Sequence, residues 1–224
     1  MKKIISFLVG IVIFVVFPIL GWGISDLGSY FENFYRSAFL VVMTFSTLLV
    51  VIFVPNEGRG YGDGDKKKLI KRQKFTILTL QIIPILITIL SPYFDRHDIF
   101  TFNDNDNIRL IGLLFTIIGF FFMNWSIVVL GQHFSLNVTI QNNHKLIKDG
   151  PYRIIRHPRY LGIIVFLVGI PLTFNSILPL ILDIIVIGIL LWRIKDEEVL
   201  MRIEFKDEWD EYKKSTYSLI PYIY

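Results

Sequence analysis

The sequence contains no cysteine, and only 19% of its 224 residues carry a charged side chain. The missing cysteines exclude disulfide frameworks, zinc–thiolate sites, iron–sulfur clusters and thiol nucleophiles. Hydrophobic residues reach 53% and the mean hydropathy is +0.56, which excludes disordered, coiled-coil and collagen-like chains. Because the apolar residues come in long blocks, the composition also argues against a soluble globular domain.

Four blocks of the chain have no charged residue and are long enough to cross a membrane as helices: residues 4–25, 37–56, 75–94 and 110–132. Each would span a hydrocarbon core of about 30 Å. Lys2 and Lys3 precede the first block as in a signal peptide, but the apolar run is too long for one and Gly21-Trp22-Gly23 is a poor cleavage site. We therefore expect residues 4–24 to be a retained transmembrane helix.

Residues 160–192 form a fifth apolar stretch with a single charge, Asp183. As one helix its 33 residues would be about 50 Å long, which exceeds the bilayer. Gly169-Ile170-Pro171 and Pro179 break it into two legs, and Ser176 is a candidate N-cap for the second. The prediction is an all-α integral membrane fold. It has four transmembrane helices in residues 1–130, then a polar loop, a membrane-embedded hairpin and a cytoplasmic C-terminal helix in residues 131–224.

The distribution of basic residues predicts the orientation of these spans. Alternate connections face the same side, and one side holds 20 Lys and Arg residues against Arg36, Arg96 and Arg109 on the other. Basic connections stay in the cytoplasm. Both chain ends and the 55–74 and 131–159 connections are therefore expected there. No basic cluster typical of nucleic-acid binding is present.

Polar residues suited to binding or catalysis are concentrated after residue 130. Residues 150–162 contain the pattern Gly-x-Tyr-x3-Arg-His-Pro-x-Tyr-x-Gly, at the cytoplasmic mouth of the predicted hairpin. A second group follows where the hairpin returns: Arg193-x3-Glu197-Glu198. Arg193 and Glu197 are neighbours on one helical face. A basic juxtamembrane loop explains the arginines but not the histidines or the Gly-Pro and His-Pro breaks.

These two patterns, with Glu211-Tyr212 and Pro221 downstream, resemble the isoprenylcysteine carboxyl methyltransferase family and its phospholipid methyltransferase relatives. The resemblance covers roughly residues 131–222. It implies an all-helical membrane enzyme that binds S-adenosylmethionine at the cytoplasmic face, with no Rossmann domain and no metal. It also implies a lipidic or amphipathic small-molecule substrate and contact with membrane lipids.

The resemblance further implies roles for individual residues. Arg193 and Glu197 match the family's pair beside the methyl acceptor. Cofactor contacts are implied at His144, Leu146, Ile147, Tyr152, His157, Pro158, Arg159 and Tyr160. The family has another glutamine contact upstream, which neither Gln141 nor the neighbourhood of Asn137 matches clearly.

This residue set is consistent with methyl transfer, but it does not identify the methyl acceptor. The methyl group already sits on a sulfonium leaving group, so the reaction mainly needs a positioned nucleophile. A prenylcysteine carboxylate is ionised at neutral pH and needs no general base. Arg193 is suited to orient it. A phospholipid amine is the alternative acceptor, and a scaffold without enzymatic activity is a third possibility.

Overall fold

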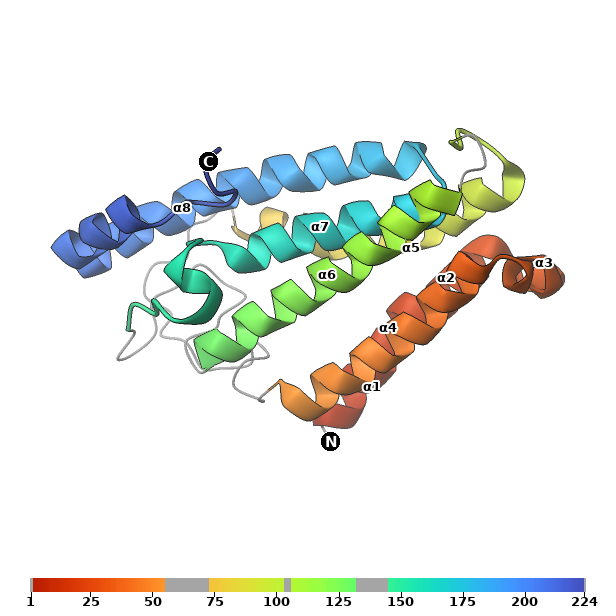
Figure 1. Cartoon of the computed structure of the whole chain (residues 1–224), viewed down its shortest axis with the longest axis horizontal. Helices are drawn as coiled ribbons and strands as arrows, with labels where there is room; N and C mark the ends of the chain where they lie inside the picture. The colour runs from red at the N-terminus through yellow and green to blue at the C-terminus, as the bar shows by residue number, and fades with distance from the viewer. Residues whose placement is uncertain (1, 55–72, 103–105, 132–144, 224) are drawn as a thin grey trace.

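The computed structural model describes residues 2–54, 73–102, 106–131 and 145–223. Within these residues, every secondary-structure element longer than an isolated bridge is helical. Figure 1 shows a bundle of long helices. In chain order they are α1 (Lys2–Ile11), η1 (Val12–Val16), α2 (Phe17–Trp22), η2 (Ile24–Asp26), α3 (Leu27–Glu32), α4 (Phe34–Phe53), α5 (Gln73–His97), α6 (Asp106–Leu130), η5 (Gly150–Arg153), α7 (Pro158–Thr173) and α8 (Leu178–Ser215).

Four helical segments are long and apolar enough to cross a membrane: Lys3–Trp22, Phe34–Phe53, Phe75–His97 and Asp106–Leu130. The first joins α1, η1 and α2 into one rod (Figure 1). These segments coincide with the four predicted blocks to within a few residues at each end. The predicted all-α, multi-pass integral membrane architecture is therefore confirmed.

Glycines allow α6 and α7 to pack with their backbones in close contact. A Cβ added at Gly119 would lie 2.2 Å from the Phe166 nitrogen, and one at Gly162 would lie 2.5 Å from the Met123 nitrogen. Small residues bring membrane helices together in this way. Because α7 begins directly after the His-Pro break, this packing fixes the position of the sequence motif against α6.

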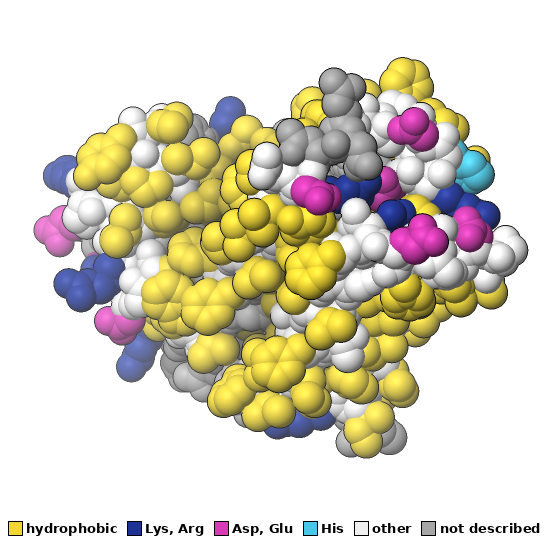
Figure 2. All heavy atoms as spheres, turned by 45° about the vertical axis from the view of Figure 1, so that its right-hand side comes forward, with side chains coloured by type: hydrophobic (Ala, Val, Ile, Leu, Met, Phe, Trp, Pro, Cys, Tyr) yellow, Lys and Arg dark blue, Asp and Glu magenta, His cyan; other side chains and the backbone are white. Residues whose placement is uncertain are grey.

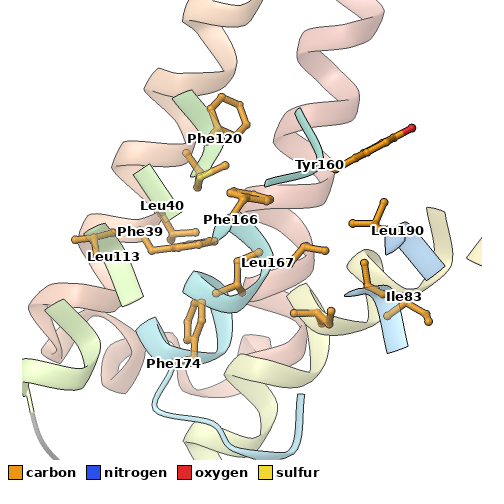
Figure 3. Packing of buried hydrophobic residues seen from close by; sticks show 14 of the residues in the cluster. Phe39, Leu40, Ile83, Leu113, Phe120, Tyr160, Phe166, Leu167, Phe174 and Leu190 are labelled. Atoms are coloured by element: carbon orange, nitrogen blue, oxygen red, sulfur yellow. The ribbon is translucent and has the colours of Figure 1, made fainter. Parts of the chain in front are cut away.

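The buried core lies where α4, α5, α6, α7 and α8 meet. Figure 3 shows Phe39 and Leu40 of α4 facing Phe166, Leu167 and Phe174 in the α7 region. The rings of Phe39 and Phe174 pack edge to face with centroids 5.2 Å apart. This apolar layer lies between the polar clusters found at the two ends of the bundle.

The connection from α7 to α8 differs from the predicted N-cap. Ile177, not Ser176, precedes α8, and no side chain caps this helix, so the Ser176 prediction is wrong. The Ser176 hydroxyl instead donates to the Ser91 carbonyl of α5 at 2.7 Å, which ties the turn to the bundle. Pro179 does lie in the first turn of α8.

Helix α8 continues far beyond the predicted hairpin and then doubles back. Lys206 has φ 47° and ψ −118°, which interrupts the helix. The reversal brings Lys213 Nζ to 3.5 Å from Glu198 Oε2, although 15 residues of straight helix would place them about 22 Å apart. Near its start, α8 also buries Asp183, whose carboxylate oxygens accept no hydrogen bond from a described residue.

Candidate functional site

The His-Pro motif lies in a tight loop that the C-terminal segment holds in place. The main-chain nitrogens of Arg156 and His157 donate to the carbonyls of Tyr217 at 2.8 Å and Ser218 at 3.0 Å. The Tyr217 nitrogen donates back to the Ile154 carbonyl at 2.9 Å. Pro158 then starts α7, where a missing N–H costs nothing. The motif is therefore fixed by residues 61 to 63 positions away in the chain.

The first turn of α7 lies against the middle of α8. Arg193 Nε donates to the Tyr160 hydroxyl at 2.8 Å, and both side chains are buried. The rings of His157 and Tyr160 stack with centroids 5.7 Å apart and an angle of 14° between their planes. An imidazole, a phenol and a guanidinium therefore form a continuous group, in which Tyr160 and Arg193 lie 33 residues apart in the chain.

The predicted residue Glu197 lies one turn beyond Arg193, beside the histidine. Its Oε2 is 3.7 Å from His157 Nδ1. This oxygen is buried and accepts no hydrogen bond from the described residues. Buried carboxylate oxygens usually have a donor, so an acceptor left open here is suited to a bound ligand.

Glu198 lies between the charged and polar side chains of the site and contacts three of them. Its Oε1 accepts from Arg156 Nε at 3.0 Å and from the Ser218 hydroxyl at 3.2 Å, and it lies 3.4 Å from His157 Nε2. Burial alone would raise the pKa of Glu198, but hydrogen bonding from His157 and the charge of Arg156 together lower that pKa to about 2. Glu198 is therefore ionised at neutral pH.

Tyr152, the next predicted contact, lies buried in η5 beside the same group of elements. Its carbonyl accepts from the Tyr212 hydroxyl at 2.6 Å, and its own hydroxyl lies 3.4 Å from the Ser126 carbonyl of α6. Burial raises the pKa of the Tyr152 phenol, which keeps it protonated. The tyrosine connects the loop to both α6 and the reversed end of α8.

The structure brings together most of the residues singled out by sequence. Tyr152 is buried in η5, and His157, Pro158 and Tyr160 are buried at the start of α7, where Arg159 is half-buried. Leu146 and Ile147 are half-buried in the loop before η5. His144 lies outside the described residues, and so do Gln141 and Asn137.

Sequence reasoning missed the structural role of Arg156, Glu198 and Ser218. Arg156 donates to the carbonyls of Lys213 and Thr216 as well as to Glu198. The sequence did offer a signal for two of them, because Arg156 directly precedes His157 in the motif and Glu198 is the second residue of the Glu-Glu pair. Their partners in the C-terminal segment could not be found by spacing, since the chain reversal at Lys206 brings them near.

Comparison with known proteins agrees with the predicted resemblance. The model of the isoprenylcysteine carboxyl methyltransferase family matches residues 110–203. A probable protein-S-isoprenylcysteine O-methyltransferase of Oryza sativa subsp. indica is 31% identical over 123 residues, which cover 52% of this chain and 62% of that protein. The protein-S-isoprenylcysteine O-methyltransferase of Schizosaccharomyces pombe is 30% identical over 116 residues, 49% of this chain and 48% of that protein.

The chain therefore spans about half to three fifths of the length of these curated relatives. A solved structure of the eukaryotic intramembrane Ras methyltransferase of the same family aligns with 99% of this chain and 94% of its own, at 16% identity and a TM-score of 0.47. The matched segment begins in α6 and ends in α8, so it contains Tyr152, His157, Arg193 and Glu197. Residues 110–203 of this chain are therefore similar to the isoprenylcysteine carboxyl methyltransferase family.

Proposed function

We propose that this protein is an S-adenosylmethionine-dependent methyltransferase that methylates the carboxylate of a prenylcysteine-like or other lipidic substrate. The observation that carries the proposal is the buried group in which Arg193 binds Tyr160 and Glu197 lies beside His157. This group falls within the family match, and the relatives are named as isoprenylcysteine O-methyltransferases.

The residues present fit the proposed cofactor. S-adenosylmethionine carries an ammonium and ribose hydroxyls as donors, and Glu197 Oε2 is a buried acceptor without a hydrogen bond from the described residues. We assign Leu146, Ile147, Tyr152, His157, Pro158, Arg159 and Tyr160 to cofactor binding, together with His144. When bound, the cofactor supplies a methyl group on a sulfonium leaving group.

Arg193 is assigned to the acceptor. Its Nε donates to the Tyr160 hydroxyl at 2.8 Å, which fixes the plane of the guanidinium, and a planar guanidinium matches the geometry of a carboxylate. The carboxylate is already ionised at neutral pH, so positioning and removal of water are what this site must provide. Glu197, one helical turn away, keeps the region from accumulating positive charge.

The membrane arrangement that suits this chemistry places the site at the cytoplasmic surface. In this proposal α7 and the first part of α8 form a membrane-embedded hairpin, and the end of α8 lies in the cytoplasm with the N-terminus. The excess of basic residues on that side supports it. A reporter fused after residue 220 should be cytoplasmic and one inserted at residue 102 external. The reverse result would contradict the orientation.

Transfer of labelled methyl groups tests the function directly. Purified protein with labelled S-adenosylmethionine should methylate a small prenylcysteine analogue and not phosphatidylethanolamine. The rate should stay flat between about pH 6.5 and 8.5, because the carboxylate is ionised throughout. An amine acceptor must lose a proton first, so a rate that climbs over this range with the phospholipid would replace the proposal with N-methylation.

A further inference from the structure

A second polar site lies at the end of the bundle opposite the candidate methyltransferase site. A pocket of about 370 Å³ opens between the ends of α2 and α5, the starts of α4 and α6, helix α3 and the turn before α8. Figure 2 turns this end of the molecule toward the reader and shows acidic and basic side chains close together beside apolar ones. Along α6, Arg109 in this pocket and Ser126 beside Tyr152 are 17 residues apart, which corresponds to about 26 Å.

The basic wall of the pocket is built and held by the fold. Arg109 makes a two-pronged ion pair with Asp95, at 2.7 and 2.9 Å, and both side chains are 4% exposed. Arg36 lies over the ring of Trp22, with its central carbon 4.3 Å from the ring centroid. Arg96 donates to the Trp22 carbonyl and lies 3.5 Å from Asp26.

Arg96 marks the part of this wall that a ligand can reach. Its side chain is 23% exposed, and the partner carboxylate of Asp26 is 46% exposed, so their contact is weak and open to water. Gly23 adopts φ 104°, which favours glycine, and an added Cβ there would lie 2.1 Å from Arg96 Nη1, so the glycine leaves room for this guanidinium. A phosphate fits beside a guanidinium fixed in this way.

The opposite part of the pocket offers acceptors. Asn175, in the turn before α8, is 3% exposed and adopts φ 54°. Its amide nitrogen donates to the Phe102 carbonyl at 2.8 Å, but its Oδ1 has no hydrogen-bond partner among the described residues. Glu32 adds an exposed carboxylate to the same pocket. A buried amide oxygen without a donor, near a carboxylate, is suited to an ammonium group.

We propose that this pocket binds a phosphate–ammonium zwitterion, the headgroup chemistry of an ethanolamine phospholipid. Three arginines and four carboxylates line it, so a purely anionic headgroup would meet excess negative charge. Ile24, Phe31 and Phe34 belong to η2, α3 and α4, which also carry lining residues of the pocket, and they expose 64%, 54% and 73% of their surface, which acyl chains can cover. The lipid would lie in the leaflet away from the candidate methyltransferase site, so it is a structural ligand and not the methyl acceptor.

The test uses the full chain purified in detergent and compares three probes by native mass spectrometry. These are dioleoylphosphatidylethanolamine, dioleoylphosphatidylglycerol and water-soluble glycerophosphoethanolamine. Wild-type protein should retain the ethanolamine lipid in preference to the glycerol lipid. Binding of the soluble compound as well would extend the site to free zwitterions, whereas its failure would assign the site to lipid.

Variants of Glu32 locate the binding. The exposed Glu32 side chain forms no hydrogen bond or ion pair with a described residue, so Glu32→Gln should fold normally. It should weaken ethanolamine-lipid binding about tenfold, the lower end of the affinity loss expected for one contact with a charged group. Glu32→Lys should reverse the preference toward phosphatidylglycerol. Glu204→Gln, an exposed carboxylate at the other end of the bundle, is the matched control and should change nothing. Equal binding of both lipids, or no change in the two Glu32 variants, would overturn the proposal.

Discussion

Replacing Glu198 with glutamine should destabilise the protein far more than the loss of an ordinary surface carboxylate. Glu198 is 18% exposed and contacts Arg156, His157 and Ser218 at 3.0 to 3.4 Å. Removing one member of a buried ion pair costs about 3–5 kcal/mol. Partial exposure and the amide's remaining hydrogen bonds reduce this to about 2–3 kcal/mol.

In a chain of this size, 1 kcal/mol corresponds to about 2–4 °C in Tm, so Glu198→Gln should lower Tm in detergent by roughly 5–10 °C. Glu208→Gln is the matched control. Glu208 pairs with Lys148 at 2.9 Å, but its side chain is 54% exposed, so the loss should stay below about 1 kcal/mol. Equal shifts in the two variants would refute the central role of Glu198.

The pH dependence of stability offers a second measurement on the same residue. Folding lowers the pKa of Glu198 to about 2, so its contribution is fully present above the unfolded value near 4.5. That contribution is lost as pH falls from there through about 2. Wild-type protein should therefore lose Tm more steeply than Glu198→Gln on acidification below about pH 5. Parallel curves for the two proteins would show that Glu198 is not held ionised by its partners.

Two further predictions address catalysis and packing. In a turnover assay, Arg193→Ala should cut methyl transfer well over tenfold. Arg193→Lys should rescue poorly because an ammonium lacks the planar fork of the guanidinium. Lys195 is exposed, so Lys195→Ala should be near wild type. Gly119→Ala should lower Tm, since overpacking costs about 1–3 kcal/mol. Gly188→Ala has open space around the new Cβ and should raise Tm by an amount equivalent to about 0.5–1 kcal/mol.

The membrane spans could be predicted from sequence because their signal is local. A charge-free block of about 20 residues has few alternatives to a spanning helix, and Pro84 and Pro92 lie inside α5 without ending it. Packing between spans carries a weaker signal. Gly112, Gly119, Gly162 and Gly169 show close approach of α6 and α7 only once the two helices are placed together.

The polar cluster at the other end of the bundle shows where sequence reasoning fails. On sequence grounds, Arg36 and Arg109 fall in external connections, and no carboxylate partner is predicted for either. The structure buries Asp95 and Arg109 against each other, with Arg36 Nε 4.0 Å from the same carboxylate. These residues belong to α4, α5 and α6, so their pairing depends on how three helices pack.

The adjacent residues Glu197 and Glu198 have different roles, one in ligand chemistry and the other in holding the structure. Successive residues of a helix point about 100° apart, so the two carboxylates approach His157 differently, Glu197 at Nδ1 and Glu198 at Nε2. Glu198 turns toward Arg156 and Ser218, and these contacts fix the His-Pro loop and the C-terminal segment to α8. Glu197 turns toward His157 and retains an oxygen without a hydrogen bond from the described residues. The first carboxylate is therefore the one available to a ligand, and the second holds in place the loop that presents it.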